Sequence, residues 1–141
     1  MTLLRQAHRD DIAGMHRVRL AVRENRLSSP DRISEADYVR EIELPGRGWV
    51  IETGGVIVAF AIGNSSDGNI WALFVDPDHE GRGYGRRLHD VMVAWLGSRG
   101  LEQSWLTTAP GTRAQRFYEA AGWRCVGPVH GGELRFVRNV R

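Results

Sequence analysis

The sequence predicts an α/β fold, in which helices pack against a mixed sheet in the order β-α-α-β-β-β-α-β-α-β-β. Three observations lead to this prediction. The run Ile70–Val75 is apolar throughout, as in an inner strand buried on both faces. The segment after it has an apolar stripe at helical spacing, and all five prolines lie between periodic segments. Because the 141 residues contain no repeat or linker, we expect a single domain over 1–141.

The first half of the chain gives local signals for one strand, two helices and a two-stranded hairpin. Residues 2–7 form a short strand, and Asp10 and Asp11 place acids at the positive end of a helix that continues to Asn25. Ser34 to Asp37 resembles a capping box, which predicts a second helix over 35–43. Gly54-Gly55 predicts a hairpin turn between strands at 49–52 and 56–62.

The second half alternates helices and strands. The stripe of the long helix has members three and four residues apart, and Gly97 and Gly100 end the helix. Its members are Tyr84, Leu88, Val91, Met92, Trp95 and Leu96. A strand at 105–108 follows, then a last helix closed by Gly122. Two short strands near 123–127 and 132–138 complete the sheet.

The composition excludes several classes of function. All 19 basic residues are arginine, which rules out a Schiff-base lysine and a Walker-type phosphate site. The net charge of +2 argues against a nucleic-acid partner. The five histidines show no metal-ligand spacing, so no metal is expected, and a surface position is expected for His79. The single Cys125 is expected to be a buried structural residue. No apolar run is long enough to span a membrane, and we expect a cytoplasmic protein.

A glycine-rich loop follows the apolar strand and opens the long helix. In Gly81-Arg82-Gly83-Tyr84-Gly85-Arg86-Arg87 the alternate glycines remove side chains that would block a close ligand. The N–H groups at the start of the helix and the three arginines suit a pyrophosphate. The alternative is a flexible surface turn. The spacing G-x-G-x-G differs from both the Walker and the dinucleotide-binding patterns.

The stretch Glu80-Gly81-Arg82-Gly83-Tyr84-Gly85 resembles motif A of the GNAT superfamily of N-acetyltransferases, and residues 113–123 resemble its second, tyrosine-bearing signature. The resemblance covers nearly the whole chain. It implies a splayed central strand at residues 70–75 and acetyl-CoA as the cofactor. Glu80 departs from the usual glutamine or arginine, and we expect its carboxylate to point away from the ligand.

The resemblance also implies roles at the reacting centre. The main chains of Phe74 and Val75 hold the pantetheine arm and polarise the thioester carbonyl. Tyr118 is the general acid for the departing thiolate, although a core tyrosine on an apolar stripe is the alternative. No carboxylate lies on residues 70–75, where many relatives place one. Glu24, at the end of the first helix, is the candidate base; the alternative is that Glu24 is only a solvated helix-end charge and water takes the proton.

These features predict an acetyl-CoA-dependent N-acetyltransferase that acts by direct transfer on a small-molecule or peptide amine, with a homodimer compatible with the family. Three other readings stay open: an acetyltransferase acting on aminoacyl-tRNA, a non-catalytic CoA-binding regulator, and a structural domain whose glycines are only turns. The sequence does not identify the acceptor, since one scaffold serves many acceptors.

Overall fold

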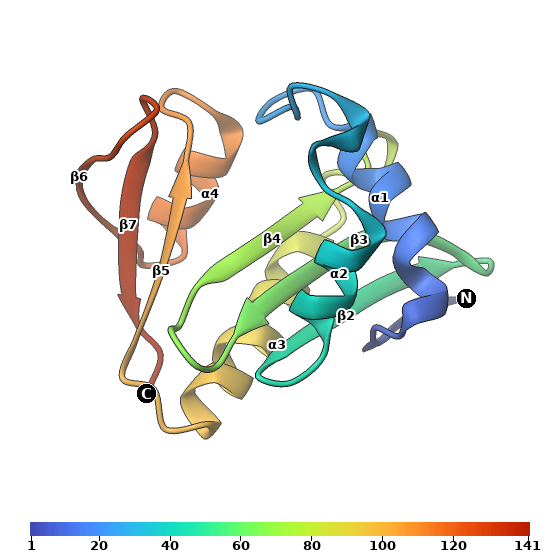
Figure 1. Ribbon diagram of the computed structural model, residues 1–141, viewed down its shortest axis with the longest axis horizontal. Coiled ribbons are helices and arrows are strands. Elements are labelled where there is room, and N and C mark those ends of the chain that lie inside the picture. The colour runs from blue at the N-terminus through green and yellow to red at the C-terminus, as the bar shows by residue number, and fades with distance from the viewer.

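The computed structural model describes residues 1–141 and divides the strands between two sheets that open away from each other (Figure 1). The strands are β1 (Thr2–Gln6), β2 (Gly46–Thr53), β3 (Val56–Asn64), β4 (Ile70–Val75), β5 (Gln103–Thr108), β6 (Arg124–Pro128) and β7 (Leu134–Asn139). The helices are α1 (Ile12–Ala21), α2 (Glu35–Ile42), α3 (Tyr84–Ser98) and α4 (Arg113–Ala120), with short 3-10 turns at Arg9–Asp11, Pro30–Arg32 and Pro77–His79. The predicted α/β class and element order are confirmed.

The first sheet has the order β1-β2-β3-β4, with every neighbouring pair antiparallel. Gly54 and Gly55 both have positive φ, as the tight β2–β3 turn requires. Helices α1 and α2 cover one face of this sheet and α3 covers the other (Figure 1). The α3 stripe packs against the core as predicted, with Leu88, Met92 and Leu96 fully inaccessible to solvent and Val91 and Trp95 partly buried.

The second sheet has the order β5-β7-β6 and is also antiparallel. The two sheets meet through one parallel bridge between Asn69 and Trp105, where the Trp105 N–H donates to the Gly68 carbonyl over 3.0 Å. From that point β4 and β5 diverge (Figure 1). The mixed character of the predicted sheet is therefore limited to this one bridge, and the predicted splay of residues 70–75 is present.

Four details of the predicted fold are wrong. The first helix ends at Ala21 rather than Asn25, because Val22 is extended and Asn25 has a left-handed backbone. Gly97 does not end α3 but lies inside it. Strand β4 packs against the core on both faces, but it is not central: it lies at the edge of its sheet, so only Ile70 and Ala72 are buried.

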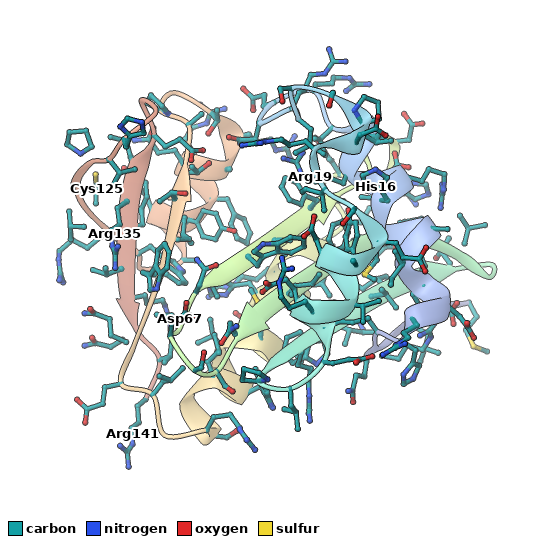
Figure 2. The ribbon with its side chains drawn as sticks, in the orientation of Figure 1. His16, Arg19, Asp67, Cys125, Arg135 and Arg141 are labelled. Atoms are coloured by element: carbon teal, nitrogen blue, oxygen red, sulfur yellow. The ribbon has the colours of Figure 1, made fainter.

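The fourth error concerns Cys125, which is exposed rather than buried (Figure 2). It lies on β6, an edge strand of the second sheet, next to an irregularity in the β6–β7 register. Its neighbour Val126 is also exposed, so β6 contributes little to the core. None of the helices is both long and apolar enough to cross a membrane.

Candidate functional site

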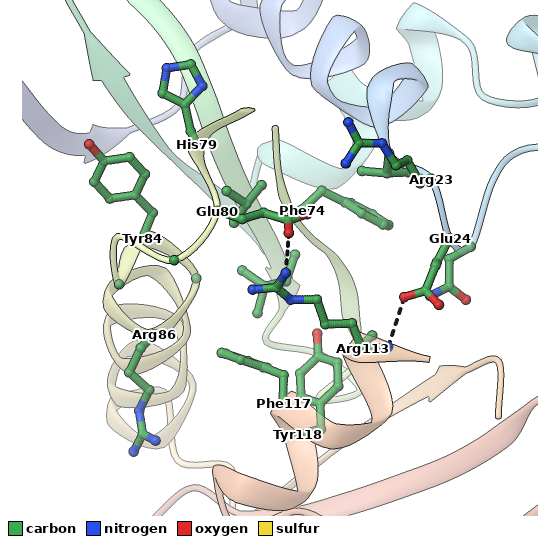
Figure 3. A pocket seen from close by; sticks show the side chains of 18 residues that line it. Arg23, Glu24, Phe74, His79, Glu80, Tyr84, Arg86, Arg113, Phe117 and Tyr118 are labelled. Atoms are coloured by element: carbon green, nitrogen blue, oxygen red, sulfur yellow. Dashed lines mark hydrogen bonds and ion pairs between the residues drawn. The ribbon is translucent and has the colours of Figure 1, made fainter. Parts of the chain in front are cut away.

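A cavity of about 550 Å³ lies where β4 diverges from the second sheet (Figure 3). This volume falls within the usual range for a ligand pocket. Four segments line the cavity: the exit of α1, the end of β4, the glycine-rich loop with the start of α3, and the first turns of α4. The splay creates the cavity, since a continuous β4–β5 ladder would close it.

The N-terminus of α3 forms one wall and has free hydrogen-bond donors. Gly83 precedes the helix with φ 80° and ψ 8°, a left-handed conformation that favours glycine. No side chain caps this end and no acid lies in the first turn. The first hydrogen bond of the helix is from the Arg87 N–H to the Gly83 carbonyl, so the N–H groups before Arg87 are available. The arrangement fits an anionic ligand such as a pyrophosphate.

The loop residues differ in what they present to the cavity. Those that line it are Gly81, Gly83, Tyr84, Gly85 and Arg86, whereas Arg82 and Arg87 are exposed outside its lining. The Tyr84 ring packs into the core, so only its main chain is at the site. The Arg86 side chain points along the helix (Figure 3), and its Nε forms an ion pair with an Asp90 carboxylate oxygen at 3.0 Å.

The end of β4 forms the second wall and has a free edge. The Asp76 N–H donates to the Val58 carbonyl on β3 over 2.8 Å. Because an antiparallel ladder alternates, the peptide groups of Phe74 also face β3, and those of Leu73 and Val75 face the cavity. Leu73 is therefore a main-chain candidate that the sequence analysis missed, since register cannot be read from an apolar run. The Phe74 side chain lines the cavity.

Tyr118 lies on α4 at the base of the cavity, with its hydroxyl directed towards the opening (Figure 3). Its side chain is 6% exposed and makes edge contacts with Phe117 and Trp123, with centroids 5.3 and 5.6 Å away. Burial raises the pKa of Tyr118 above its ordinary value. The hydroxyl therefore stays protonated at neutral pH and can donate to an acceptor in the cavity.

Glu24 and Asn25, just beyond α1, reach across the cavity to the C-terminal half. One Glu24 carboxylate oxygen accepts from the Arg113 N–H at 2.9 Å, at the start of α4. The Asn25 side-chain oxygen accepts from the Ala109 N–H at 3.2 Å and from the Thr108 hydroxyl at 3.5 Å. We call these two residues the α1-exit bridge. The bridge places Glu24 in the lining of the same cavity as Tyr118.

Glu80 does not point away from the cavity, contrary to the expectation from sequence. Its carboxylate forms an ion pair with the Arg113 guanidinium, and both residues line the cavity (Figure 3). The pair joins the glycine-rich loop to α4 across the cavity. Arg113 was not singled out from the sequence, because nothing local shows that the first residue of α4 faces residue 80.

Two histidines have notable surroundings, and His79, for which a surface position was expected, is partly exposed. His79 lines the cavity, and its buried Nδ1 has no hydrogen-bond partner, with the nearest Asp76 carboxylate oxygen 4.0 Å away. His89 is fully buried, and burial lowers its pKa. The Trp123 indole N–H donates to His89 Nε2 over 2.9 Å, so His89 is neutral with its proton on Nδ1, next to Asp90. His89 therefore holds α3 to the start of β6.

Residues 12–123 match the acetyltransferase (GNAT) family, and the chain belongs to that family. No curated protein matches the sequence at a significant level. The family assignment agrees with acetyl-CoA as the expected cofactor, and no group of three His, Cys, Asp or Glu side chains is placed to hold a metal ion.

Solved structures of low identity share the fold. An acetyltransferase of the GNAT family from Staphylococcus aureus Mu50 has a TM-score of 0.85 at 16% identity, with 100% of each chain covered. The ribosomal-protein-S18-alanine N-acetyltransferase from Escherichia coli has a TM-score of 0.79 at 18% identity, covering 99% of this chain and 94% of that one. The yncA protein from Salmonella typhimurium, solved with its cofactor acetyl-CoA, has a TM-score of 0.77 at 19% identity, covering 100% and 95%.

Proposed function

We propose that the protein is an acetyl-CoA-dependent N-acetyltransferase that moves the acetyl group directly to a primary amine in a ternary complex. One observation carries the proposal: the uncapped start of α3, the free edge of β4 and the Tyr118 hydroxyl all line one cavity. The anion site would bind the pyrophosphate of the cofactor, the main-chain donor edge would polarise the thioester carbonyl, and the proton donor would serve the leaving sulfur. Family membership and the acetyl-CoA complex of the Salmonella neighbour support it.

Each wall has a distinct task in the proposed reaction. The N–H groups from Gly83 to Arg86 bind the pyrophosphate, and the peptide groups of Leu73 and Val75 orient the pantetheine arm. The bound cofactor supplies the activated acetyl group as a thioester. Tyr118 holds the proton that the leaving sulfur takes up. Because that hydroxyl is a weaker acid than a thiol, it donates only as negative charge develops on the sulfur.

Glu24 is the proposed base for the acceptor amine. One of its oxygens is committed to the Arg113 N–H, which leaves the second oxygen to accept a proton. If the amine reaches the cavity already neutral, water suffices and Glu24 only positions α4. The Escherichia coli neighbour is named for an alanine of a protein acceptor, so a peptide amine and a small-molecule amine are both included in the proposal.

Binding of acetyl-CoA is the first test. Cofactor at about a hundred times its Kd should add about 2.7 kcal/mol to the free energy of unfolding, measured by urea titration. NAD and ATP serve as competing phosphate ligands. A larger stabilisation by either of them, or none by acetyl-CoA in folded protein, would refute the proposal.

Gly85→Ala tests where the cofactor lies. Gly85 has an ordinary helical backbone, and an added Cβ would lie 3.6 Å from Phe117 and 3.7 Å from Val75, which is normal contact. The fold should tolerate the methyl group, but it occupies the cavity wall, so CoA affinity should fall roughly tenfold, about 1.4 kcal/mol. Ser98→Ala, at the other end of α3, is the matched control. Unchanged affinity in Gly85→Ala would show that the cofactor lies elsewhere.

Release of free thiol in the presence of an amine then separates an enzyme from a CoA-binding regulator. Amino acids, peptides, polyamines and aminoacyl-tRNA form the acceptor panel. Binding of acetyl-CoA without amine-dependent thiol release from any of them would favour the regulator.

A further inference from the structure

An arginine with no counter-charge lies beside the cavity, on the face of β4 opposite α3. The Arg19 guanidinium, from α1, lies 4.2 Å from the centroid of the Phe74 ring. Its Nη1 is buried and has no hydrogen-bond partner in the chain (Figure 2 labels Arg19). The Arg19 residue as a whole is half-buried, but a buried nitrogen without a partner costs free energy, and native proteins seldom keep one. Folding stability therefore does not explain why Arg19 lies at this position, and we consider a role in ligand binding.

The side chains around Arg19 provide no anion. Arg19 takes part in none of the ion pairs of the chain. Tyr38 is the titratable side chain that interacts electrostatically with Arg19. Burial raises the pKa of Tyr38 to about 12, so Tyr38 is neutral at neutral pH. The Tyr38 hydroxyl forms no hydrogen bond with Arg19, and its proton is directed to His16. His16 Nε2 lies 3.0 Å from the Pro30 carbonyl, which only accepts, so His16 Nδ1 accepts from Tyr38 over 2.9 Å.

Arg19 itself remains charged. Burial lowers its pKa, but the ordinary value of 12.5 is so high that the guanidinium stays protonated at neutral pH. The result is a permanent positive charge with one nitrogen that lacks a partner.

The charge lies on the side of the cavity opposite the proposed phosphate site. Phe74 connects the two places, because its ring lines the cavity and also contacts Arg19. The Phe74 side chain packs with the α1 and α2 core, whereas Leu73 and Val75 pack with the α3 core. Arg23 also lines the cavity from the α1 exit, near Phe74 in Figure 3, and forms no ion pair. The pair Arg19 and Arg23 is thus separated from the arginines at the start of α3 by β4.

We propose that Arg19, assisted by Arg23, binds a carboxylate of the acceptor, so that the substrate is an amine that also carries a carboxylate. This inference rests on the proposed function. A guanidinium binds a carboxylate through two parallel hydrogen bonds, and it would gain in the complex the partner that the chain does not provide. Both a free amino acid and the N-terminus of an acidic peptide have this chemistry. Simple amines such as polyamines do not.

The experiment compares acceptors that differ only in the carboxylate. Amino acids of different amine-to-carboxylate spacing are paired with their amides, and tetrapeptides with Asp or Glu at the second position are paired with Asn or Gln. Two quantities are measured for each pair: the Kd for the CoA-saturated protein by calorimetry, and kcat/KM by thiol release. For at least one series, we expect the carboxylate member to be favoured about 10²-fold. The series that shows the preference distinguishes the amino acid from the peptide.

Arg19→Met keeps the stem and its contact with Phe74 but removes the charge. It should abolish the preference and leave the values for the amide nearly unchanged. Arg19→Lys should keep part of the preference. Arg99→Met is the matched control, because Arg99 also lies by an aromatic ring, 5.9 Å from the Trp95 centroid, but outside the cavity. It should keep the full preference.

The outcomes separate this inference from the proposed function. The inference is overturned if the wild-type protein has the same Kd and kcat/KM for carboxylates and amides, or if the preference survives in Arg19→Met. In either case, turnover of any acceptor still supports the proposed transferase. If nothing is turned over, carboxylate-dependent binding that is lost in Arg19→Met still supports the inference. Absence of such binding in every series overturns it.

Discussion

Tyr118→Phe separates a proton donor from a core residue, because the structure predicts different effects on stability and on chemistry. The side chain is 6% exposed, and burial alone accounts for the raised pKa of Tyr118, with no hydrogen bond contributing. Phenylalanine keeps the edge contacts with Phe117 and Trp123 and removes a hydroxyl without a protein partner. The free energy of unfolding should therefore change by less than about 0.5 kcal/mol.

The rate should respond very differently. If the hydroxyl donates to the departing sulfur, kcat should fall roughly 10²-fold, which corresponds to about 2.7 kcal/mol in the transition state. The Kd for acetyl-CoA should change little, because the donors at α3 and β4 are untouched. The assay is thiol release with saturating acceptor, under conditions in which chemistry limits the rate.

Tyr38→Phe is the matched control, since Tyr38 is equally buried but its hydroxyl donates to His16. Its loss should cost about 1 kcal/mol of stability and leave kcat close to that of the wild-type protein. The wild-type protein should also lose stability above about pH 10, where the unfolded Tyr118 ionises while the folded one stays protonated. Tyr118→Phe should lose less. Equal kcat in Tyr118→Phe and the wild-type protein would refute the general-acid role.

Three further outcomes are expected. Glu80→Gln removes a carboxylate near the anion site, so the affinity for CoA, measured by calorimetry, should rise about threefold. Arg113→Gln removes the cationic partner of Glu80, so the affinity should fall about threefold. Shifts of both variants in the same direction would contradict this prediction. Burial lowers the pKa of His89, so the free energy of unfolding should fall as the pH drops below about 6.5, where only the unfolded His89 gains a proton. His89→Gln should reduce this pH dependence in urea titrations. An unchanged pH dependence would assign it to other groups. Cys125 should react with a thiol reagent in the native protein at the rate of an exposed thiol, with or without CoA, whereas protection would mean that another surface covers it.

The parts of the fold that depend on local patterns could be predicted from the sequence. The α3 stripe, the Gly54-Gly55 turn and the capping box at Ser34 each depend on a few neighbouring residues, and each is confirmed. The position of the glycine-rich loop between a strand and a helix is also confirmed, because Gly83 takes the left-handed conformation that such a junction requires.

What depends on distant segments could not be predicted. The apolar run of β4 looks like a central strand, yet the strand is half-exposed because its neighbour diverges after a single bridge. The contacts of Glu80 with Arg113 and of His89 with Trp123 join residues more than thirty positions apart. Cys125 looks like a core residue by type, and only the order of the second sheet shows that it lies on an edge strand.

The α1-exit bridge has a consequence for how this protein can diverge. The two sheets share only one β-bridge, and beyond it Glu24 and Asn25 bind the segment before and at the start of α4, as the Glu80–Arg113 pair does from the other wall, so the width of the separation depends in part on this bridge. That same segment of α1 and its exit carries Arg19 and Arg23, while α4 carries Tyr118. An insertion or deletion between α1 and α2 that adapts the protein to a new acceptor would therefore also shift the proposed proton donor. Changes of specificity should arise by substitution within a segment of fixed length, and length changes there should be accompanied by compensating changes near residue 109.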